Sequence, residues 1–281
     1  MTIPFEKWQA LGNDYIIVER DSLPFELTPE RVRRICRAHF GCHSDGVLLL
    51  SHSEDERFVA QLRIFNPDGS EAEISGNGAR EAVLYLRRAG WTGNDTFSIA
   101  TAAGEVRPRI IDGRTCEVEM GRARLESPDF PSGGADGHGK LTVERRELEF
   151  QHVNIGNPQC VIEAGDEIDA LDLGRLGPQI EANPLFPNRT NVAFIRIGDD
   201  EVRARIFERG VGETLSSGTG ACASAVTAVL RGAASPVRVR LDGGELEVAV
   251  GDDLAVTLTG WAEPVFAGEF SSELVSALEA D

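Results

Sequence analysis

Two stretches of the chain repeat one another at an offset of 142 residues. The segment EISGNGAREAVLYLRRAG begins at Glu73, and LSSGTGACASAVTAVLRG begins at Leu215. Each places a serine before a Gly-x-Gly and then enters an apolar run of helical period. At the same offset, Arg63-Ile64-Phe65 falls on Arg205-Ile206-Phe207. A repeat this long is not a solenoid period and indicates a duplicated domain.

The elements predicted in each half support the duplication. Short β-branched runs, such as YIIVE and GVLLLS in the first half and QCVIE and NVAFIRI in the second, are typical of strands. Each half has one central helix, which starts at the Gly-x-Gly, where the chain turns from a strand into the helix; we call this turn a corner. We therefore expect an α+β fold of two similar domains, over residues 1–120 completed by 265–281, and over 121–264. The alternative is two ordinary α+β domains with no shared site.

Charge and cysteine usage limit the classes of partner. The formal net charge of −18 opposes binding to nucleic acid, and no apolar stretch reaches the length of a membrane span. The N-terminus shows no signal-peptide pattern, and the five dispersed cysteines are typical of reduced thiols in a cytosol. The five histidines form no zinc-binding pattern. We expect a cytoplasmic protein without a metal, nucleic-acid or membrane partner.

The two Gly-x-Gly corners predict a site for an anionic group. A helix that begins there exposes backbone N–H groups, and its dipole attracts a carboxylate or phosphate. The four glycines leave room for such a group to approach the backbone. Ser75 and Ser217 are also favoured N-caps, and capping alone would explain either corner. Because the corners are equivalent points of a duplicated domain, we expect both to face one shared cleft.

Polar residues suited to a small zwitterion lie beside the predicted strands. Arg209 suits a carboxylate, and Glu208 suits an ammonium group. Any one asparagine beside glycine is explained by turn chemistry, but the set exceeds what turns require. The asparagines concerned are Asn13, Asn66, Asn157 and Asn191. Together these residues predict a site for a small-molecule amino acid.

At these residues the chain strongly resembles the diaminopimelate epimerases, which are PLP-independent amino-acid epimerases and racemases. The matching stretches are ALGNDYIIVE, RIFNPDGSEAEISGNGAR, VNIGNPQCVI, FPNRTNVAF and FERGVGETLSSGTGACA. They span nearly the whole chain in the family's order. The resemblance implies two similar domains, each a β-barrel-like sheet around a central helix, with the active site in the cleft between them. It also implies an enzyme without a cofactor, and a homodimer.

The resemblance assigns roles to individual residues. It implies that the substrate is held by Asn13, Asn66, Asn157, Asn191, Glu208 and Arg209. The backbone N–H groups of Gly76-Asn77 and Gly218-Thr219 are expected to donate to its α-carboxylate. The implied reaction inverts the α-carbon by two-base proton transfer, most simply from LL- to meso-diaminopimelate in lysine biosynthesis.

The catalytic positions depart from the family pattern. The family has a cysteine at each helix tip, where one thiolate removes the α-proton and the opposite thiol returns a proton. This chain has Ser75 and Ser217 instead, and an alcohol is a far weaker acid than a thiol. Gln159 stands where the family usually has histidine, and Gly46 where some members have glutamine. His43, in GCHSDG, is a candidate substitute base, with an exposed loop as the alternative explanation.

Three explanations of the serines stay open. They are engineered replacements that trap substrate, or natural residues of an enzyme with another base, or natural residues of a protein with a different role. Gln159 favours a natural origin, because a trap needs no third change. Cys160 and Cys222 keep cysteine at family-typical positions. An epimerase is the first hypothesis; the alternatives are a catalytically impaired amino-acid-binding homologue and a related racemase or isomerase.

Overall fold

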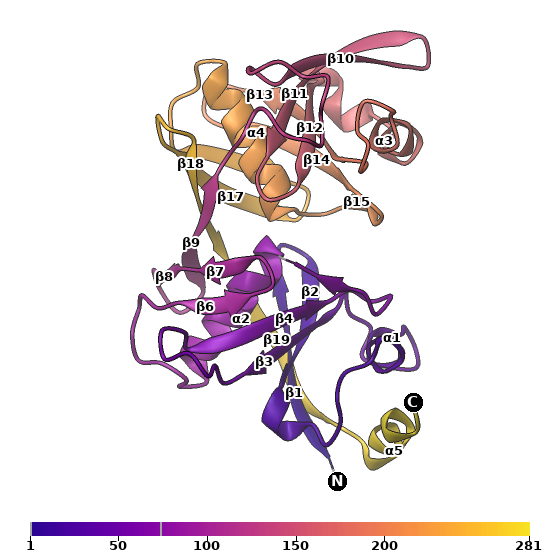
Figure 1. Ribbon diagram of the computed structural model, residues 1–281, viewed down its shortest axis with the longest axis vertical. Helices are drawn as coiled ribbons and strands as arrows, with labels where there is room; N and C mark the ends of the chain where they lie inside the picture. The colour runs from indigo at the N-terminus through magenta and orange to yellow at the C-terminus, as the bar shows by residue number, and fades with distance from the viewer. Residues whose placement is uncertain (1, 74) are drawn as a thin grey trace. The chain divides into compact units, whose positions relative to one another are not determined.

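The chain builds two units and passes between them twice (Figure 1). The computed structural model describes residues 2–73 and 75–281. Unit 1 runs to Val118 and is completed by Trp261–Asp281, whereas unit 2 is the segment Glu119–Gly260. Within the described residues, no helix is long and apolar enough to cross a membrane.

Unit 1 combines one sheet with three α-helices. Its helices are α1 (Pro29–Cys36), α2 (Gly76–Arg88) and α5 (Ser272–Ala280), with a 3-10 turn, η1 (Arg20–Ser22). Its strands are β1 (Ile3–Ala10), β2 (Asn13–Glu19), β3 (Val47–Ser51), β4 (Ala60–Phe65), β5 (Glu71–Ala72), β6 (Ile99–Thr101), β7 (Gly104–Val106), β8 (Pro108–Ile110) and β19 (Glu263–Phe270). The sheet order is β19-β1-β2-β3-β4-β6-β7, and β5 pairs with β4.

Unit 2 combines a second sheet with two α-helices. Its helices are α3 (Leu173–Glu181) and α4 (Gly218–Leu230), with a 3-10 helix, η2 (Gly165–Ala170). Its strands are β10 (His138–Val143), β11 (Arg146–Asn154), β12 (Pro158–Glu163), β13 (Asn191–Ile197), β14 (Val202–Glu208), β15 (Gly212–Thr214), β16 (Val237–Leu241), β17 (Gly244–Val250) and β18 (Ala255–Trp261), and β9 (Thr115–Arg122) leads into the unit. The second sheet has the order β10-β11-β12-β13-β14-β16-β17-β18-β9-β8, and β15 pairs with β14. Its last strand, β8, pairs with β9.

The strand pairings of the two units repeat one another. The pairs β2–β3 and β12–β13 are parallel, as are β4–β6 and β14–β16, whereas β3–β4 and β13–β14 are antiparallel. Helices α2 and α4 each have 13 residues and pack against strands of their own sheet. Neither sheet closes into a barrel within residues 2–73 and 75–281. The predicted α+β fold with an internal duplication is confirmed.

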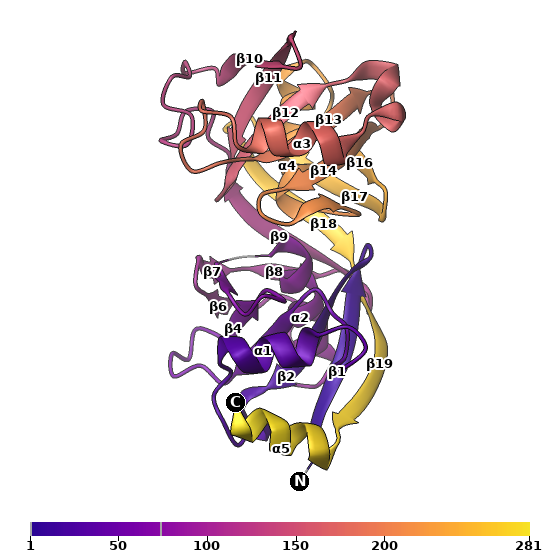
Figure 2. The ribbon, with the colours of Figure 1, turned by 90° about the vertical axis from the view of Figure 1, so that its right-hand side faces the viewer.

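Peripheral helices complete the core of each unit. Figure 2 shows α1 and α5 on one side of unit 1, where Val32 and Ile35 of α1 join Val275 and Leu278 of α5 in a single buried cluster with strand residues. In unit 2, α3 contributes Leu173 and Ile180 to the corresponding cluster. Burial of these apolar side chains stabilises each helix, since helices this short are marginal alone.

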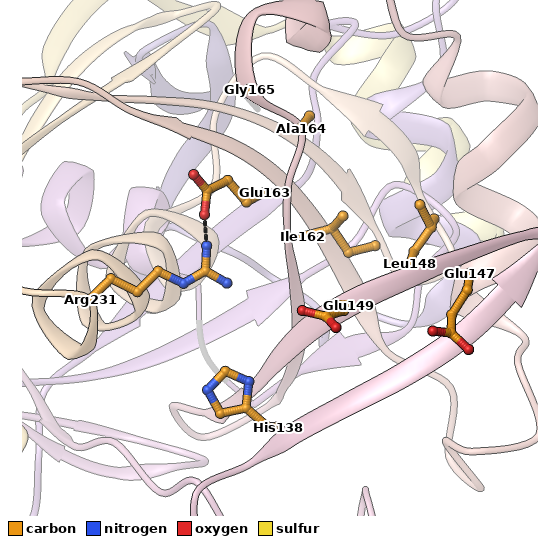
Figure 3. Close-up of a pocket in the computed structure, with 9 residues that line it drawn as sticks. All are labelled: His138, Glu147, Leu148, Glu149, Ile162, Glu163, Ala164, Gly165 and Arg231. Atoms are coloured by element: carbon orange, nitrogen blue, oxygen red, sulfur yellow. Dashed lines mark ion pairs between the residues drawn. The ribbon is translucent and has the colours of Figure 1, made fainter.

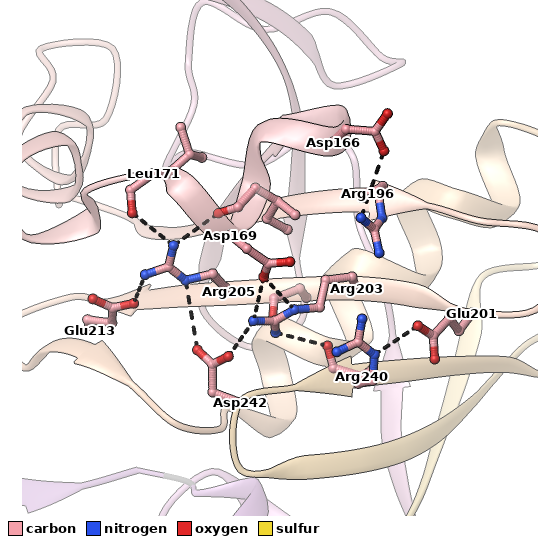
Figure 4. Close-up of polar contacts among 12 residues, drawn as sticks. Asp166, Asp169, Leu171, Arg196, Glu201, Arg203, Arg205, Glu213, Arg240 and Asp242 are labelled. Atoms are coloured by element: carbon pink, nitrogen blue, oxygen red, sulfur yellow. Dashed lines mark hydrogen bonds and ion pairs between the residues drawn. The ribbon is translucent and has the colours of Figure 1, made fainter.

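An ion pair fixes the hairpin that precedes each central helix. Arg63 of β4 pairs with Glu71 of β5 at 2.8 Å, and Arg205 of β14 pairs with Glu213 of β15 at 2.5 Å. In unit 2 this pair belongs to a larger network around the buried Arg203 (Figure 4). The guanidinium of Arg203 contacts the carboxylates of Asp169 and Asp242, while Arg205 donates to the carbonyls of Ile168 and Leu171. The network ties η2 to β14 and to the β16–β17 turn.

Candidate active site

The serine of each repeat caps a central helix. The Oγ atom of Ser75 accepts a hydrogen bond of 3.1 Å from the N–H of Gly78 in α2. The Oγ atom of Ser217 accepts one of 3.2 Å from the N–H of Gly220 in α4. Each corner is therefore the N-terminus of a helix, where the first N–H groups and the helix dipole favour an anion.

The second glycine of each Gly-x-Gly packs closely against a strand of its own sheet. A Cβ atom at Gly78 would lie 3.0 Å from Cδ2 of Leu48 on β3, and one at Gly220 would lie 2.9 Å from Cδ1 of Ile206 on β14. The sequence alone suggests that these glycines make room for a ligand. The structure shows that they let the helix start lie directly against a strand.

Polar side chains of unit 1 gather at the start of α2. The side-chain nitrogen of Asn77 donates to Oδ1 of Asn13 at 3.1 Å, and that of Asn13 donates to Asp45 at 2.8 Å. Oδ1 of Asn77 accepts from the buried Arg80 at 2.7 Å. Because both ends of each amide are engaged, Asn13 and Asn77 are held in one orientation at the helix start that Ser75 caps.

An equivalent cluster lies at the start of α4. The side-chain nitrogen of Asn157 donates to Oγ1 of Thr219 at 3.3 Å; the same two positions are joined in unit 1 by Asn13 and Asn77, with the donor reversed. The fully buried Gln159 donates to both residues, at 2.7 Å to Asn157 and 3.1 Å to Thr219. Gln159 therefore orients Asn157 and Thr219, and a neutral amide offers no proton for catalysis.

A carboxylate lies beside the serine of unit 2. The hydroxyl of Ser217 donates to Oε2 of Glu208 at 3.3 Å, and the hydroxyl of Thr214 donates to Oε1 at 2.9 Å. Ser217 is only 4% exposed, and Glu208 is half-buried at the end of β14. A carboxylate hydrogen-bonded to a hydroxyl can accept its proton, so this pair has the parts of a general base.

Asn191 and Arg209 lie next to each other in unit 2. Oδ1 of the buried Asn191 accepts from the backbone N–H of Arg209 at 2.9 Å, and its amide nitrogen donates to the carbonyl of Pro158 at 3.0 Å. Asn191 therefore holds the backbone of the turn after β14. The exposed side chain of Arg209 donates to the carbonyl of Asn188 at 3.0 Å.

Two predicted residues make local contacts in turns or loops of unit 1. Asn66 lies in the β4–β5 turn, where its side chain donates to Oγ of Ser70 at 3.0 Å. His43 lies in an exposed loop, and its backbone carbonyl accepts from Lys7 at 2.5 Å. The alternative explanation for each, a turn asparagine and a solvated loop, matches these contacts.

Sequence reasoning missed Tyr15, which follows Asn13 in the GNDY stretch. Its hydroxyl donates to Oγ of Ser75 at 3.2 Å. The strand period places Tyr15 on the same face as Asn13, a signal that was present in the sequence. Each serine thus has a second polar partner: a phenol for Ser75 and the Glu208 carboxylate for Ser217.

Burial makes four of the five cysteines poor sources of a thiolate. Burial raises the pKa of the Cys160 thiol well above its usual value, and it raises the pKa of Cys36 to about 11 and that of Cys116 to about 12. Burial also raises the pKa of Cys42. A thiol with a raised pKa has little thiolate near neutral pH.

A separate pocket of unit 2 contains none of the predicted site residues (Figure 3). It is lined by His138, Glu147, Leu148, Glu149, Ile162, Glu163, Ala164, Gly165 and Arg231. Arg231 forms an ion pair with Glu163, so the guanidinium that lines this pocket already has a carboxylate partner. In the described residues, no group of three or more histidine, cysteine, aspartate or glutamate side chains could hold a metal ion.

Glu81 is a buried carboxyl group on α2, and its replacement by glutamine is expected to stabilise the protein at neutral pH. Burial raises its pKa well above the usual value, although Arg80 opposes the shift. Above pH ~4.3 the unfolded chain loses this proton while the folded chain keeps it, so Glu81 lowers stability by about 1.4 kcal/mol per pH unit. Stability stops falling once the pH exceeds the pKa of Glu81 in the folded state, because both states have then lost the proton. Urea unfolding at pH 5 and pH 7 measures the gain of Glu81→Gln, which should be larger at pH 7.

Glu71→Gln is the matched control, with the opposite sign. The hydrogen bond from Arg63 lowers the pKa of Glu71, so its carboxylate stabilises the folded state above the unfolded pKa and loses that effect on acidification. Because the pair is exposed, the loss at pH 7 should stay below ~1 kcal/mol. An equal effect of Glu81→Gln at both pH values would contradict the buried neutral carboxyl group.

Comparison with known proteins finds relatives that match most of the chain. Residues 5–126 and 151–264 match the sequence profile of diaminopimelate epimerase. Diaminopimelate epimerase 2 of Nostoc sp. (strain PCC 7120) is 41% identical over 276 residues, covering 96% of each chain. A diaminopimelate epimerase of Synechococcus sp. (strain JA-3-3Ab) is 42% identical over 278 residues, covering 95% of this chain and 97% of that protein.

A solved structure shows the same fold at low identity. A hydroxyproline epimerase from Agrobacterium vitis matches with a TM-score of 0.69 and 17% identity, covering 96% of this chain and 93% of that one. This likeness concerns the fold alone. The profile match and the sequence relatives carry the assignment, because each extends over most of the chain, and the two relatives named are 41% and 42% identical. The chain therefore belongs to the diaminopimelate epimerase family.

Proposed function

We propose that the protein is a cofactor-independent epimerase of an amino-acid α-carbon, and that it converts LL- to meso-diaminopimelate. The observation that carries the proposal is the equivalence of two capped helix starts, each with a bonded pair of polar side chains. Stereoinversion needs one proton acceptor and one proton donor on opposite faces of the carbon. The proposal therefore requires Ser75 and Ser217 to serve the same substrate molecule.

Different site residues are proposed to bind different groups of the substrate. We assign the α-carboxylate to the N–H groups of Gly76-Asn77 and Gly218-Thr219, because helix starts favour anions. Arg209 suits the second carboxylate of the substrate, and Glu208 suits an ammonium group as well as the hydroxyl of Ser217. The amides that bind polar groups are Asn13, Asn66, Asn157 and Asn191, with Gln159 as a modulator.

Hydrogen exchange in deuterated water tests the proposal. The protein is incubated with LL- and with meso-diaminopimelate, and NMR follows deuterium at the α-carbon together with the appearance of the other isomer. Exchange coupled to interconversion supports the proposal. Binding of diaminopimelate, measured by calorimetry, without exchange at either centre would refute it and support an amino-acid-binding homologue. Exchange of another amino acid alone would assign a different substrate.

A non-catalytic binding role is the second candidate. It is favoured by the caps, since each serine Oγ already accepts a hydrogen bond from its own helix. The same calorimetry and exchange measurements separate the two functions.

We also propose that the protein is a cytoplasmic homodimer. The five cysteines, none of them in a disulfide, suit a reducing compartment, and the dimer follows from the family resemblance. Light scattering at several protein concentrations tests the dimer.

A further inference from the structure

The hydroxyl of Ser75 has a defined set of partners. Its Oγ atom accepts from the N–H of Gly78 at 3.1 Å and from the phenol of Tyr15 at 3.2 Å. A hydroxyl has two acceptor lone pairs and one hydrogen to donate. With both lone pairs engaged, the hydrogen of Ser75 is directed to a third group, and the phenol is positioned to replace that hydrogen when it leaves.

The phenol is held rigidly. Tyr15 is 5% exposed on β2, opposite Trp8 of β1. Its ring lies against Gly46, where an added Cβ atom would be 2.7 Å from Cε1 of Tyr15 and 2.2 Å from the carbonyl oxygen of Phe65. Gly46 therefore leaves the space that the ring fills. A buried ring packed in this way cannot swing, so its hydroxyl stays aimed at Ser75.

The two serines have chemically different partners. Tyr15 and Gln159 occupy equivalent positions on β2 and β12, but only a phenol has an acidic hydrogen to supply. Ser217 instead donates to the carboxylate of Glu208. One helix start thus carries an acid, and the other carries a base.

We propose that Tyr15 is a positioning residue that supplies a proton to Ser75 during reprotonation of the substrate, an inference that rests on the proposed epimerase function. As the O–H bond of Ser75 breaks and the new C–H bond forms, the O–H bond of Tyr15 breaks and that of Ser75 is restored. The electron pair of the carbanion forms the new C–H bond, the pair of the broken Tyr15 O–H bond stays on the oxygen as the negative charge of the phenolate, and water returns the proton. In the reverse direction, the α-proton passes to Ser75 as the proton of Ser75 passes to the phenolate. A phenol, with an ordinary pKa of about 10, avoids a serine alkoxide.

A comparison of Tyr15→Phe in two backgrounds tests the role. In the unaltered chain, Tyr15→Phe should lower α-deuterium exchange of diaminopimelate by about 10²-fold or more. In a Ser75→Cys background the same change should lower exchange by less than about 3-fold, because a thiol needs no phenol to supply its proton. Tyr85→Phe is the matched control, since Tyr85 is the only other tyrosine and donates to Glu19 at 2.8 Å. It should leave exchange unchanged in both backgrounds.

The pH profile separates a proton-supplying role from packing. In Tyr85→Phe, Tyr15 is the only tyrosine of the chain, so biosynthetic incorporation of 3-fluorotyrosine changes this phenol alone. Because fluorine makes a phenol more acidic, the alkaline limb of the exchange profile should move to lower pH. An unmoved limb, or equal losses from Tyr15→Phe in the unaltered chain and in the Ser75→Cys background, would overturn the proposal. The fluorotyrosine readout stands even if Tyr15→Phe fails to fold.

Failure of the underlying function has its own signature. If neither the unaltered chain nor the Ser75→Cys, Ser217→Cys double variant exchanges the α-hydrogen, the epimerase function is refuted, and the role of Tyr15 with it. If both proteins exchange and Tyr15→Phe has no effect in the unaltered chain, only the role of Tyr15 is refuted.

Discussion

Replacing Ser75 and Ser217 together by cysteine is expected to raise the rate of α-hydrogen exchange of diaminopimelate by about 10²–10⁴-fold. Both positions cap a helix, and a helix N-terminus lowers the pKa of a thiol from its usual ~8.5 toward neutrality. The same helix start cannot make an alcohol a useful acid. The amides around each tip stay bonded to one another, so the substitution changes the acid without removing the binding groups. Deuterium incorporation followed by NMR measures the gain.

A third capping serine provides the control. Ser271 caps α5 and accepts a hydrogen bond of 3.2 Å from the N–H of Leu274, so Ser271→Cys makes the same change at a helix start outside the site. It should cost about 1 kcal/mol of stability at most and leave exchange unchanged. If the double variant folds and binds diaminopimelate but exchanges no faster, the assignment of Ser75 and Ser217 to the reacting carbon is wrong.

The features that were predictable from the sequence have local causes. Serine before Gly-x-Gly predicts a capped helix, and both caps form because the hydroxyl reaches an N–H only three residues away. The offset of 142 residues predicts a repeated topology, because two halves with the same order of strands and helices pair their strands in the same way. The capped helix starts and the repeat therefore needed no long-range information.

The features that were missed depend on strand pairing. The contact of Tyr15 with Ser75 joins residues 60 positions apart, and that of Gln159 with Thr219 joins residues at the same separation. Such contacts arise only when the sheet has placed its strands against the central helix. The role of Gly46 could not be predicted from the sequence for the same reason, since it leaves space for a ring from another strand. The resemblance assigns Asn66 to the substrate; its side chain donates to Ser70 in the β4–β5 turn, and contact with a substrate stays a prediction.

Replacing Glu208 by glutamine is expected to lower kcat/KM for diaminopimelate by about 10²-fold, which corresponds to about 2.7 kcal/mol of transition-state stabilisation. Oε2 of Glu208 accepts from Ser217 at 3.3 Å, and Oε1 accepts from Thr214 at 2.9 Å. Glutamine keeps the shape but cannot accept a proton as a carboxylate does, and it loses the charge that suits an ammonium group. Steady-state conversion of LL- to meso-diaminopimelate measures the loss.

The two roles of Glu208 predict different kinetic signatures. If the carboxylate only holds the substrate, Glu208→Gln raises KM and leaves kcat unchanged, whereas loss of a proton acceptor lowers kcat. The hydrogen bond to Ser217 favours the second result. Glu213→Gln is the matched control, because Glu213 lies in the same hairpin and its carboxylate pairs with Arg205 at 2.5 Å. If Glu213→Gln lowers kcat as much as Glu208→Gln, the hairpin's rigidity accounts for the effect, and the carboxylate of Glu208 is not the base.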